Sequence, residues 1–85
     1  MQIFYFTAEW CNPCKQIRPI IDEMIREGLS TKIQMIDVDS EIELVKKYNI
    51  SSVPTFIKID NSGIEQKRVS GKKTRSELEE FINNE

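Results

Sequence analysis

The stretch Gln2–Thr7 constrains the fold most, because it is apolar on both of the faces that a strand presents. Its central residues are Ile3, Phe4, Tyr5 and Phe6, which are β-branched or aromatic. A strand that is covered on one face only shows polar residues at every second position, and this stretch does not. We therefore predict a central strand that is buried on both sides.

A helical pattern follows this strand after a short loop. From Asn12 onward, apolar residues recur at helical spacing, and Gly28 is placed to cap the C-terminus. The apolar positions are Ile17, Ile20, Ile21, Met24 and Ile25. Pro19 lies inside this helix and deletes one backbone hydrogen bond, so we expect a kink there. Lys32–Val38 is the second predicted strand.

The second half of the chain predicts a short helix, a hairpin and a final helix. Ser40–Glu43 has the residues of a capping box that opens the short helix. Val53–Asp60 and Ile64–Val69 flank a turn-forming segment, which indicates a hairpin. Thr74–Glu77 is a second capping box. The predicted order is β-α-β-α-β-β-α, with the first two strands parallel and the last two antiparallel.

Length and composition limit the number of domains and the classes of partner. A chain of 85 residues, 31% of them charged, predicts one α/β domain over residues 1–85. No apolar run approaches the roughly 20 residues that cross a bilayer, and the apolar N-terminal stretch lacks the basic flank of a signal peptide. We therefore predict a cytoplasmic protein without a membrane partner. The net charge of −2 and the scattered basic residues argue against binding to nucleic acid.

Cys11 and Cys14 are the two cysteines of a chain that has no histidine. A structural zinc site takes four Cys or His ligands, so a metal would need carboxylates or a second chain here. As a staple, so short a ring contributes only about 2 kcal/mol, and it would not persist in a reducing cytosol. The spacing favours a reactive pair and leaves a metal half-site or an incidental pair as alternatives.

The residues around this pair resemble the thioredoxin family. Residues 8–15 read AEWCNPCK, which is similar to the family's Trp-Cys-x-Pro-Cys-Lys signature, and Pro19 matches a proline five residues after the second cysteine. Val53-Pro54-Thr55 resembles the segment where the family has a cis-proline facing the cysteines, and Gly71 matches a glycine after the last strand. The resemblance covers nearly the whole chain. It implies a thioredoxin-like fold, a four-stranded mixed sheet flanked by helices on both faces.

The chain also departs from the family pattern. It opens directly on the strand that leads to the cysteines, where full-length thioredoxins have an extra strand and helix, so its size is closer to that of glutaredoxins. Tyr5 replaces the family's usual buried Asp, and Met35 replaces the Lys that often neighbours it. Asn12 stands in place of a Gly, and Thr7 in place of a second Trp. A tyrosine is a poor base at neutral pH, so we expect water or another carboxylate to take the proton of Cys14.

Placement at a helix end assigns roles to the two cysteines. The N–H groups of a helix N-terminus stabilise a thiolate, so we predict that Cys11 is the nucleophile and that it lies at an exposed rim. Cys14, one turn later, then displaces the reduced substrate. Pro13 stiffens this first turn, Asn12 adds a polar side chain near the sulfur, and Trp10 forms an exposed lip. The predicted substrate-binding residues, which surround the pair, are Trp10, Asn12, Pro13, Val53, Pro54 and Gly71.

The function predicted from these features is a cytosolic dithiol reductant of protein disulfides. It needs no cofactor besides its own redox-active disulfide, and its expected partners are disulfide-containing proteins and a thioredoxin reductase or glutathione as electron donor. We expect a monomer. The alternatives are a glutaredoxin-like, glutathione-dependent reductant, a metal- or cluster-binding dimer that uses Cys11 from each chain, and a non-catalytic interaction module.

Overall fold

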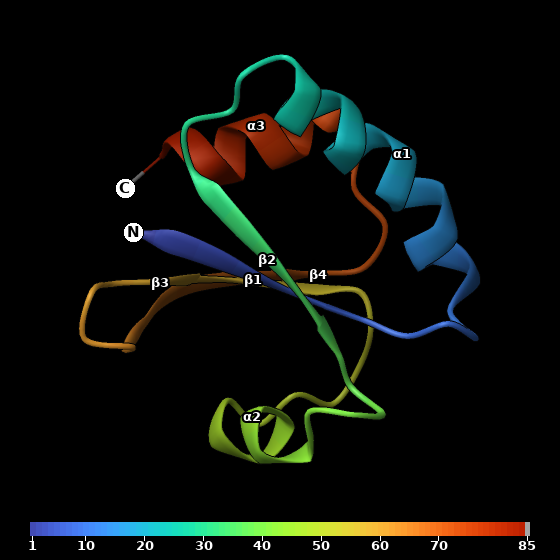
Figure 1. Ribbon diagram of the computed structural model, residues 1–85, viewed down its shortest axis with the longest axis vertical. Coiled ribbons are helices and arrows are strands. Elements are labelled where there is room, and N and C mark those ends of the chain that lie inside the picture. Colours follow the sequence, from blue (N-terminus) through green and yellow to red (C-terminus); the bar gives the residue numbers. More distant parts are fainter. Residues whose placement is uncertain (85) are drawn as a thin grey trace.

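β1 (Gln2–Thr7) is an interior strand of a four-stranded sheet, as its two apolar faces predict. The computed structural model describes residues 1–84, and Glu85, the end of the predicted domain, lies outside the described residues. The other elements are α1 (Asn12–Arg26), β2 (Lys32–Asp37), α2 (Ile42–Lys47), β3 (Thr55–Ile59), β4 (Glu65–Ser70) and α3 (Arg75–Asn83). Their order is the predicted β-α-β-α-β-β-α (Figure 1).

The strands lie in the order β2-β1-β3-β4 across the sheet. β1 is parallel to β2 and antiparallel to β3, and β3 forms an antiparallel hairpin with β4. The mixed four-stranded sheet is therefore confirmed. Thr7 pairs with Asp37, and Phe6 with Thr55, so the ends of β1 and β2 and the start of β3 meet at one edge of the sheet. This edge carries the cysteines.

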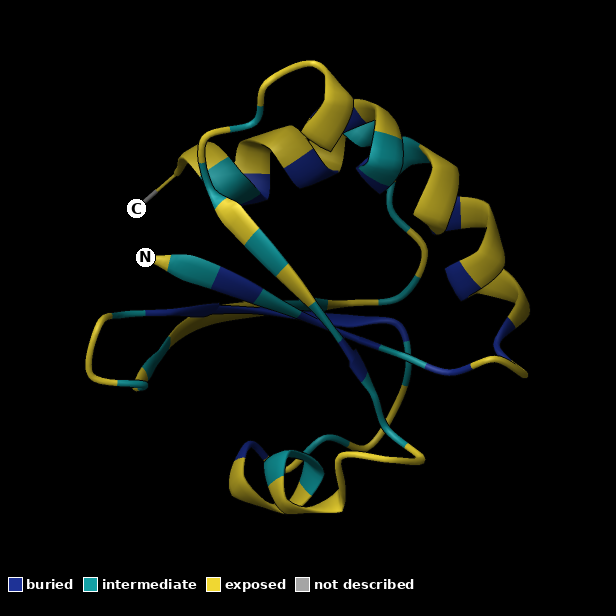
Figure 2. Ribbon diagram, viewed as in Figure 1, coloured by how far each residue is buried: buried dark blue, intermediate teal, exposed yellow. Residues whose placement is uncertain are grey.

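Helices cover both faces of the sheet, as predicted (Figure 1). On one face, α1 and α3 pack against Ile3 and Tyr5 of β1. On the other face, beside α2, Phe6 of β1 packs with Tyr48 and Ile57. Successive side chains of a strand point to opposite faces, so β1 must be apolar at every central position to serve both cores. The buried residues accordingly concentrate along the sheet and on the helix faces that look toward it (Figure 2).

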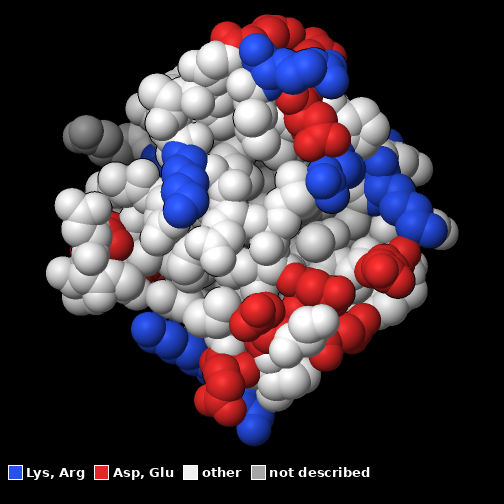
Figure 3. Space-filling model, viewed as in Figure 1, with Lys and Arg blue, Asp and Glu red and all other residues white. Residues whose placement is uncertain are grey.

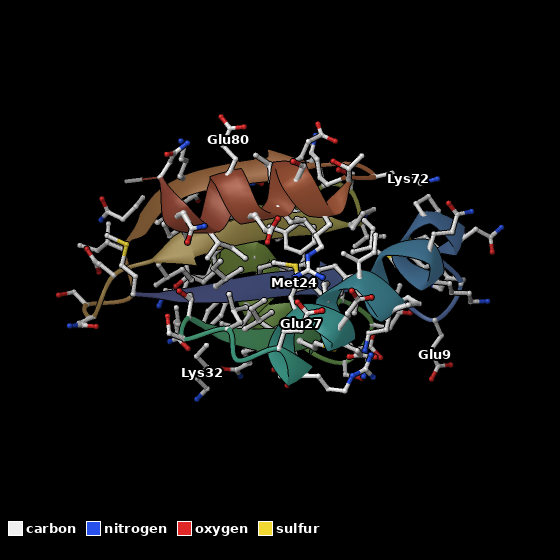
Figure 4. The ribbon with its side chains drawn as sticks, turned by 90° about the horizontal axis from the view of Figure 1, so that it is seen from above. Glu9, Met24, Glu27, Lys32, Lys72 and Glu80 are labelled. Atoms are coloured by element: carbon white, nitrogen blue, oxygen red, sulfur yellow. A yellow bond between two sulfur atoms is a disulfide. The ribbon has the colours of Figure 1, made fainter. Side chains whose placement is uncertain are left out.

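α1 and α3 lie side by side over the sheet (Figure 4). Ion pairs join them at their surface. Arg75 of α3 contacts Glu23 at 2.7 Å and Glu27 at 2.6 Å, both on the α1 side. These groups are exposed, so each pair contributes little to stability. Met24, between the two glutamates in sequence, instead points into the core.

The helix ends confirm two of the predicted caps. Gly28 has a φ of 95° and follows the C-cap residue Glu27 of α1. Its N–H donates to the carbonyl of Ile25, and the N–H of Leu29 donates to that of Met24, which is the Schellman arrangement. At α3, the Thr74 hydroxyl and the Glu77 carboxylate cap each other's backbone N–H groups as a complete capping box.

Two helix predictions are wrong. Ser40 does not cap α2, which begins after Glu41 without a side-chain cap. The N–H groups of Ser40 and Glu41 both donate to the carbonyl of Asp37, so a turn after β2 holds these residues. Ile25 is 46% exposed, because it lies at the margin of the buried stripe in the last turn of α1.

No helix within residues 1–84 combines the length and the apolar character needed to cross a membrane.

Candidate functional site

Cys11 and Cys14 lie at the start of α1, directly after the loop that follows β1. Cys11 is the N-cap residue, and the two cysteines form a disulfide with their Cα atoms 5.2 Å apart. The backbone N–H of Cys14 donates to Cys11 Sγ at 3.2 Å. The predicted position of Cys11 at a helix N-terminus is therefore confirmed.

The start of α1 favours negative charge on Cys11 Sγ. The first N–H groups of a helix have no partner inside the helix, and they form the positive end of its dipole. The first turn contains no acidic residue that would oppose this effect. The Sγ atom that accepts the Cys14 N–H is thus placed to be stabilised as a thiolate.

The two cysteines do not differ in exposure, and this part of the prediction is wrong. Cys11 is 4% exposed and Cys14 is 3% exposed. The pair packs with Ala8, Val38 and Val53, which come from the three chain segments that meet at this edge of the sheet. Any difference in reactivity must therefore come from the helix end and not from exposure.

Trp10 is the exposed lip that the sequence predicts, with 65% of its surface exposed. Its indole N–H donates to Asp39 Oδ2 at 2.9 Å, which holds the ring beside the cysteine loop. Sequence reasoning missed Asp39, because the contact spans 29 residues and no local pattern joins the two positions. The pairing of β1 with β2 brings them together.

Val53, Pro54 and Gly71 complete the rim on the side of β3. The Val53–Pro54 peptide bond is cis, as the family resemblance implies. The Gly71 N–H donates to the Pro54 carbonyl at 2.9 Å, and Gly71 has a φ of 89°, a conformation that favours glycine. β3 begins at Thr55, two residues later than predicted, so Val53 lies outside the ladder. Within the described residues its backbone N–H and carbonyl make no hydrogen bond.

Asn12 and Pro13 occupy the first two positions of α1 and are exposed beside the disulfide. The structure thus brings all six predicted substrate-binding residues to one end of the molecule, where they form a rim around the disulfide.

On the α2 side of Trp10, an apolar hollow of about 230 Å³ runs along this rim. Its lining consists of Trp10, Val38, Val45, Ile50, Ser51, Ser52 and Val53.

Tyr5 lies beneath Cys14 and is 1% exposed. Its ring stacks on Phe56 with centroids 4.6 Å apart, and its hydroxyl donates to the Cys14 carbonyl at 3.4 Å. Burial raises the pKa of the phenol above its ordinary value, an effect partly offset by a hydrogen bond with Thr7 and by the charge of Arg18. A second hollow, of about 460 Å³, opens beside Cys14.

Acidic side chains are prominent on the face of the molecule that Figure 3 shows. In the space-filling view they gather over the region between α1 and α2, with Lys and Arg side chains beside them (Figure 3). Glu9 and Lys72 lie toward the end of the molecule where α1 starts (Figure 4). Within residues 1–84 there is no group of three or more His, Cys, Asp or Glu side chains that could hold a metal ion.

The family model for thioredoxin matches residues 1–84. The chain belongs to the thioredoxin family. It is 38% identical over 79 residues to a thioredoxin of Bacillus subtilis, with 92% of this chain and 75% of the relative covered. A thioredoxin of Rickettsia bellii is 37% identical over 81 residues, with 93% and 75% covered.

Solved thioredoxins share the fold. The reduced thioredoxin pre-protein of Schistosoma mansoni superposes with a TM-score of 0.82 at 39% identity, covering 94% of this chain and 73% of that one. A thioredoxin of Nicotiana alata gives 0.84 at 34% identity, with 94% and 68% covered. With a thioredoxin fold and a Cys-x-x-Cys disulfide at the start of α1, the chain is a protein thiol–disulfide oxidoreductase.

Proposed function

We propose that the protein acts as a dithiol reductant of protein disulfides, with Cys11 as nucleophile and Cys14 as resolving cysteine. The observation that carries this assignment is the N-cap position of Cys11, whose Sγ accepts the Cys14 N–H. The helix end lowers the free energy of a thiolate at Cys11, and only the thiolate attacks a disulfide. Cys14 lies within α1 and has no such placement.

The reaction consists of two exchanges. The Cys11 thiolate attacks one sulfur of the substrate disulfide, forming a mixed disulfide and releasing the other sulfur as a thiolate. Cys14 then loses its proton and attacks Cys11 Sγ. This forms the Cys11–Cys14 disulfide, and the second substrate sulfur leaves as a thiolate that takes up a proton. Two electrons pass to the substrate, and no cofactor is needed.

Substrate binding is assigned to the rim. The Val53 backbone has no partner in the sheet and can pair with an extended substrate segment as a short added strand. Trp10 offers a large apolar surface beside Cys11, and the neighbouring hollow accepts apolar side chains. Asn12, Pro13 and Gly71 lie around the path by which a substrate reaches the disulfide.

Family membership implies disulfide-containing proteins as substrates and a thioredoxin reductase as partner. We assign the electron-donor role to this reductase in preference to glutathione. We also propose a cytoplasmic location and a monomer.

The direct test is to trap the mixed disulfide. A Cys14→Ser variant, incubated with insulin as a protein disulfide, should accumulate a covalent adduct at Cys11, because the second exchange is blocked. Mass spectrometry of the digested adduct locates the linkage. The matched Cys11→Ser variant should form none. An adduct that requires Cys14 and survives the loss of Cys11 would reverse the assignment.

A further inference from the structure

The second exchange needs a proton acceptor, since Cys14 is buried and must become a thiolate before it attacks. Tyr5 is the polar side chain beneath Cys14, and its hydroxyl already donates to the Cys14 carbonyl. Burial raises the pKa of this phenol, so it keeps its proton at neutral pH. The acceptor must come from another element.

The hollow beside Cys14 leads to two carboxylates. Its lining includes Cys14, the carboxylates Glu9 and Asp37, and the cations Lys15 and Arg18. The hollow, of about 460 Å³ and lined in part by charged side chains, has room for several water molecules, each of which occupies about 30 Å³ in the liquid. Water in it can link the Cys14 thiol to either Glu9 or Asp37.

Asp37 is the better placed of the two. It is the last residue of β2, pairs in register with Thr7 and is partly buried, whereas Glu9 is exposed on the loop before the cysteines. Asp37 Oδ1 accepts the N–H of Asp39 at 2.8 Å, which fixes the carboxylate in position. Its other oxygen makes no hydrogen bond within residues 1–84.

We propose that Asp37 accepts the Cys14 proton through water in this hollow while the mixed disulfide is resolved. The inference rests on the proposed roles of the two cysteines. The Cys14 S–H bond breaks, its proton moves through water to the carboxylate, and the thiolate attacks Cys11 Sγ. The departing substrate thiolate is then protonated from solvent, and Asp37 returns its proton to water. Lys15 and Arg18, the cations that line the hollow, favour the thiolate of Cys14.

The test compares Asp37→Asn with Glu9→Gln, two variants that each remove one negative charge from the same hollow. Asparagine keeps an oxygen that can accept the Asp39 N–H, so the turn after β2 is preserved. Reduced protein is mixed in a stopped-flow instrument with an aromatic disulfide whose released thiol is coloured. The first, bimolecular phase reports mixed-disulfide formation at Cys11. The second, unimolecular phase reports its resolution by Cys14.

We expect Asp37→Asn to slow the second phase at neutral pH by about tenfold or more, which is less than the roughly hundredfold lower end for a directly positioned base because the proton passes through water. The first phase should not change, which also shows that the variant is folded. Glu9→Gln should match the wild type, and Asp37→Glu should recover part of the rate. Below the pKa of the thiol, the resolution rate of Asp37→Asn should fall about tenfold per pH unit with the thiolate fraction, more steeply than that of the wild type.

The sign of the effect separates this role from simple electrostatics. Removing a negative charge beside Cys14 favours its thiolate, so a purely electrostatic role predicts faster resolution in Asp37→Asn. A second phase that is unchanged or faster would overturn the proposal. If no first phase occurs at Cys11, the proposed roles of the cysteines fail instead, and the inference falls with them.

Discussion

Tyr5 links the reactive loop to the core. Its ring stacks on Phe56, and its hydroxyl donates to the backbone carbonyl of Cys14. Tyr5 stands where the family resemblance implies a buried Asp, so the side chain directly beneath Cys14 is a phenol and not a carboxylate. The proton of the Cys14 thiol therefore passes to Asp37, which lies nearer the surface than Tyr5.

The raised pKa of Tyr5 makes stability depend on pH in the alkaline range. The folded chain holds the phenolic proton more tightly than the unfolded chain does, because the ordinary pKa of a tyrosine is near 10.0 and burial raises the pKa of Tyr5 above it. The stability that the tighter hold on this proton adds to the folded chain is fully present below about pH 10. It is lost as the pH rises through the pKa of Tyr5 in the folded chain. Tyr5→Phe keeps the stacked ring and removes the titrating group.

We expect Tyr5→Phe to lower the free energy of unfolding by about 1 kcal/mol at neutral pH, through loss of the hydrogen bond. The deficit should shrink as the pH rises above about 10, because only the wild type loses the tyrosine contribution. Urea unfolding of both proteins across this range measures the difference. A deficit that stays constant with pH would show that the Tyr5 phenol titrates alike in the folded and unfolded chains.

The sequence predicts the placement of single residues where a local pattern surrounds them. It does not predict contacts between residues that only the folding of the chain brings together. The position of Cys11 at a helix end follows from the strand and helix patterns on either side of it. The bond from Trp10 to Asp39 and the hollow shared by Cys14 and Asp37 have no such signature, because strand pairing creates them. The prediction that Cys11 is exposed is wrong for the same reason, since Val38 and Val53 from distant segments pack against it.

At the scale of elements, helix termini carry much of the local specificity. α1 begins after a cysteine N-cap, so the reactive sulfur accepts the helix N–H that a capping oxygen would otherwise accept. α3 opens with a complete capping box, and α2 has no side-chain cap at all. The same sequence pattern was present at Ser40 and at Thr74. Only at Thr74 is it free of a competing turn, which near Ser40 is set by the carbonyl of Asp37.

The capping box of α3 should be measurable in stability. Thr74→Ala removes the hydroxyl that accepts the Glu77 N–H, and such changes cost about 1 kcal/mol. Ser76→Ala, at an exposed position inside the same helix, is the matched control and should leave the free energy of unfolding nearly unchanged. Equal urea midpoints for the two variants would mean that the box does not stabilise α3.

At the scale of the whole molecule, one edge of the sheet assembles the site. The end of β1 supplies the cysteine loop, the end of β2 supplies Asp37 and Asp39, and the start of β3 is preceded by Val53 and Pro54. Periodicity and turn signals were enough to predict the element order. The cis bond at Pro54 required the family resemblance, because single-sequence reasoning favours trans for such bonds.

We propose above that the Cys11–Cys14 pair carries electrons from a thioredoxin reductase to protein disulfides. The most direct measurement is coupled turnover of insulin, followed by NADPH consumption, with thioredoxin reductase or with glutathione and glutathione reductase as donor system. We expect turnover with thioredoxin reductase that is lost in Cys11→Ser and in Cys14→Ser. Turnover supported by glutathione alone, or turnover that survives the loss of Cys11, would contradict it.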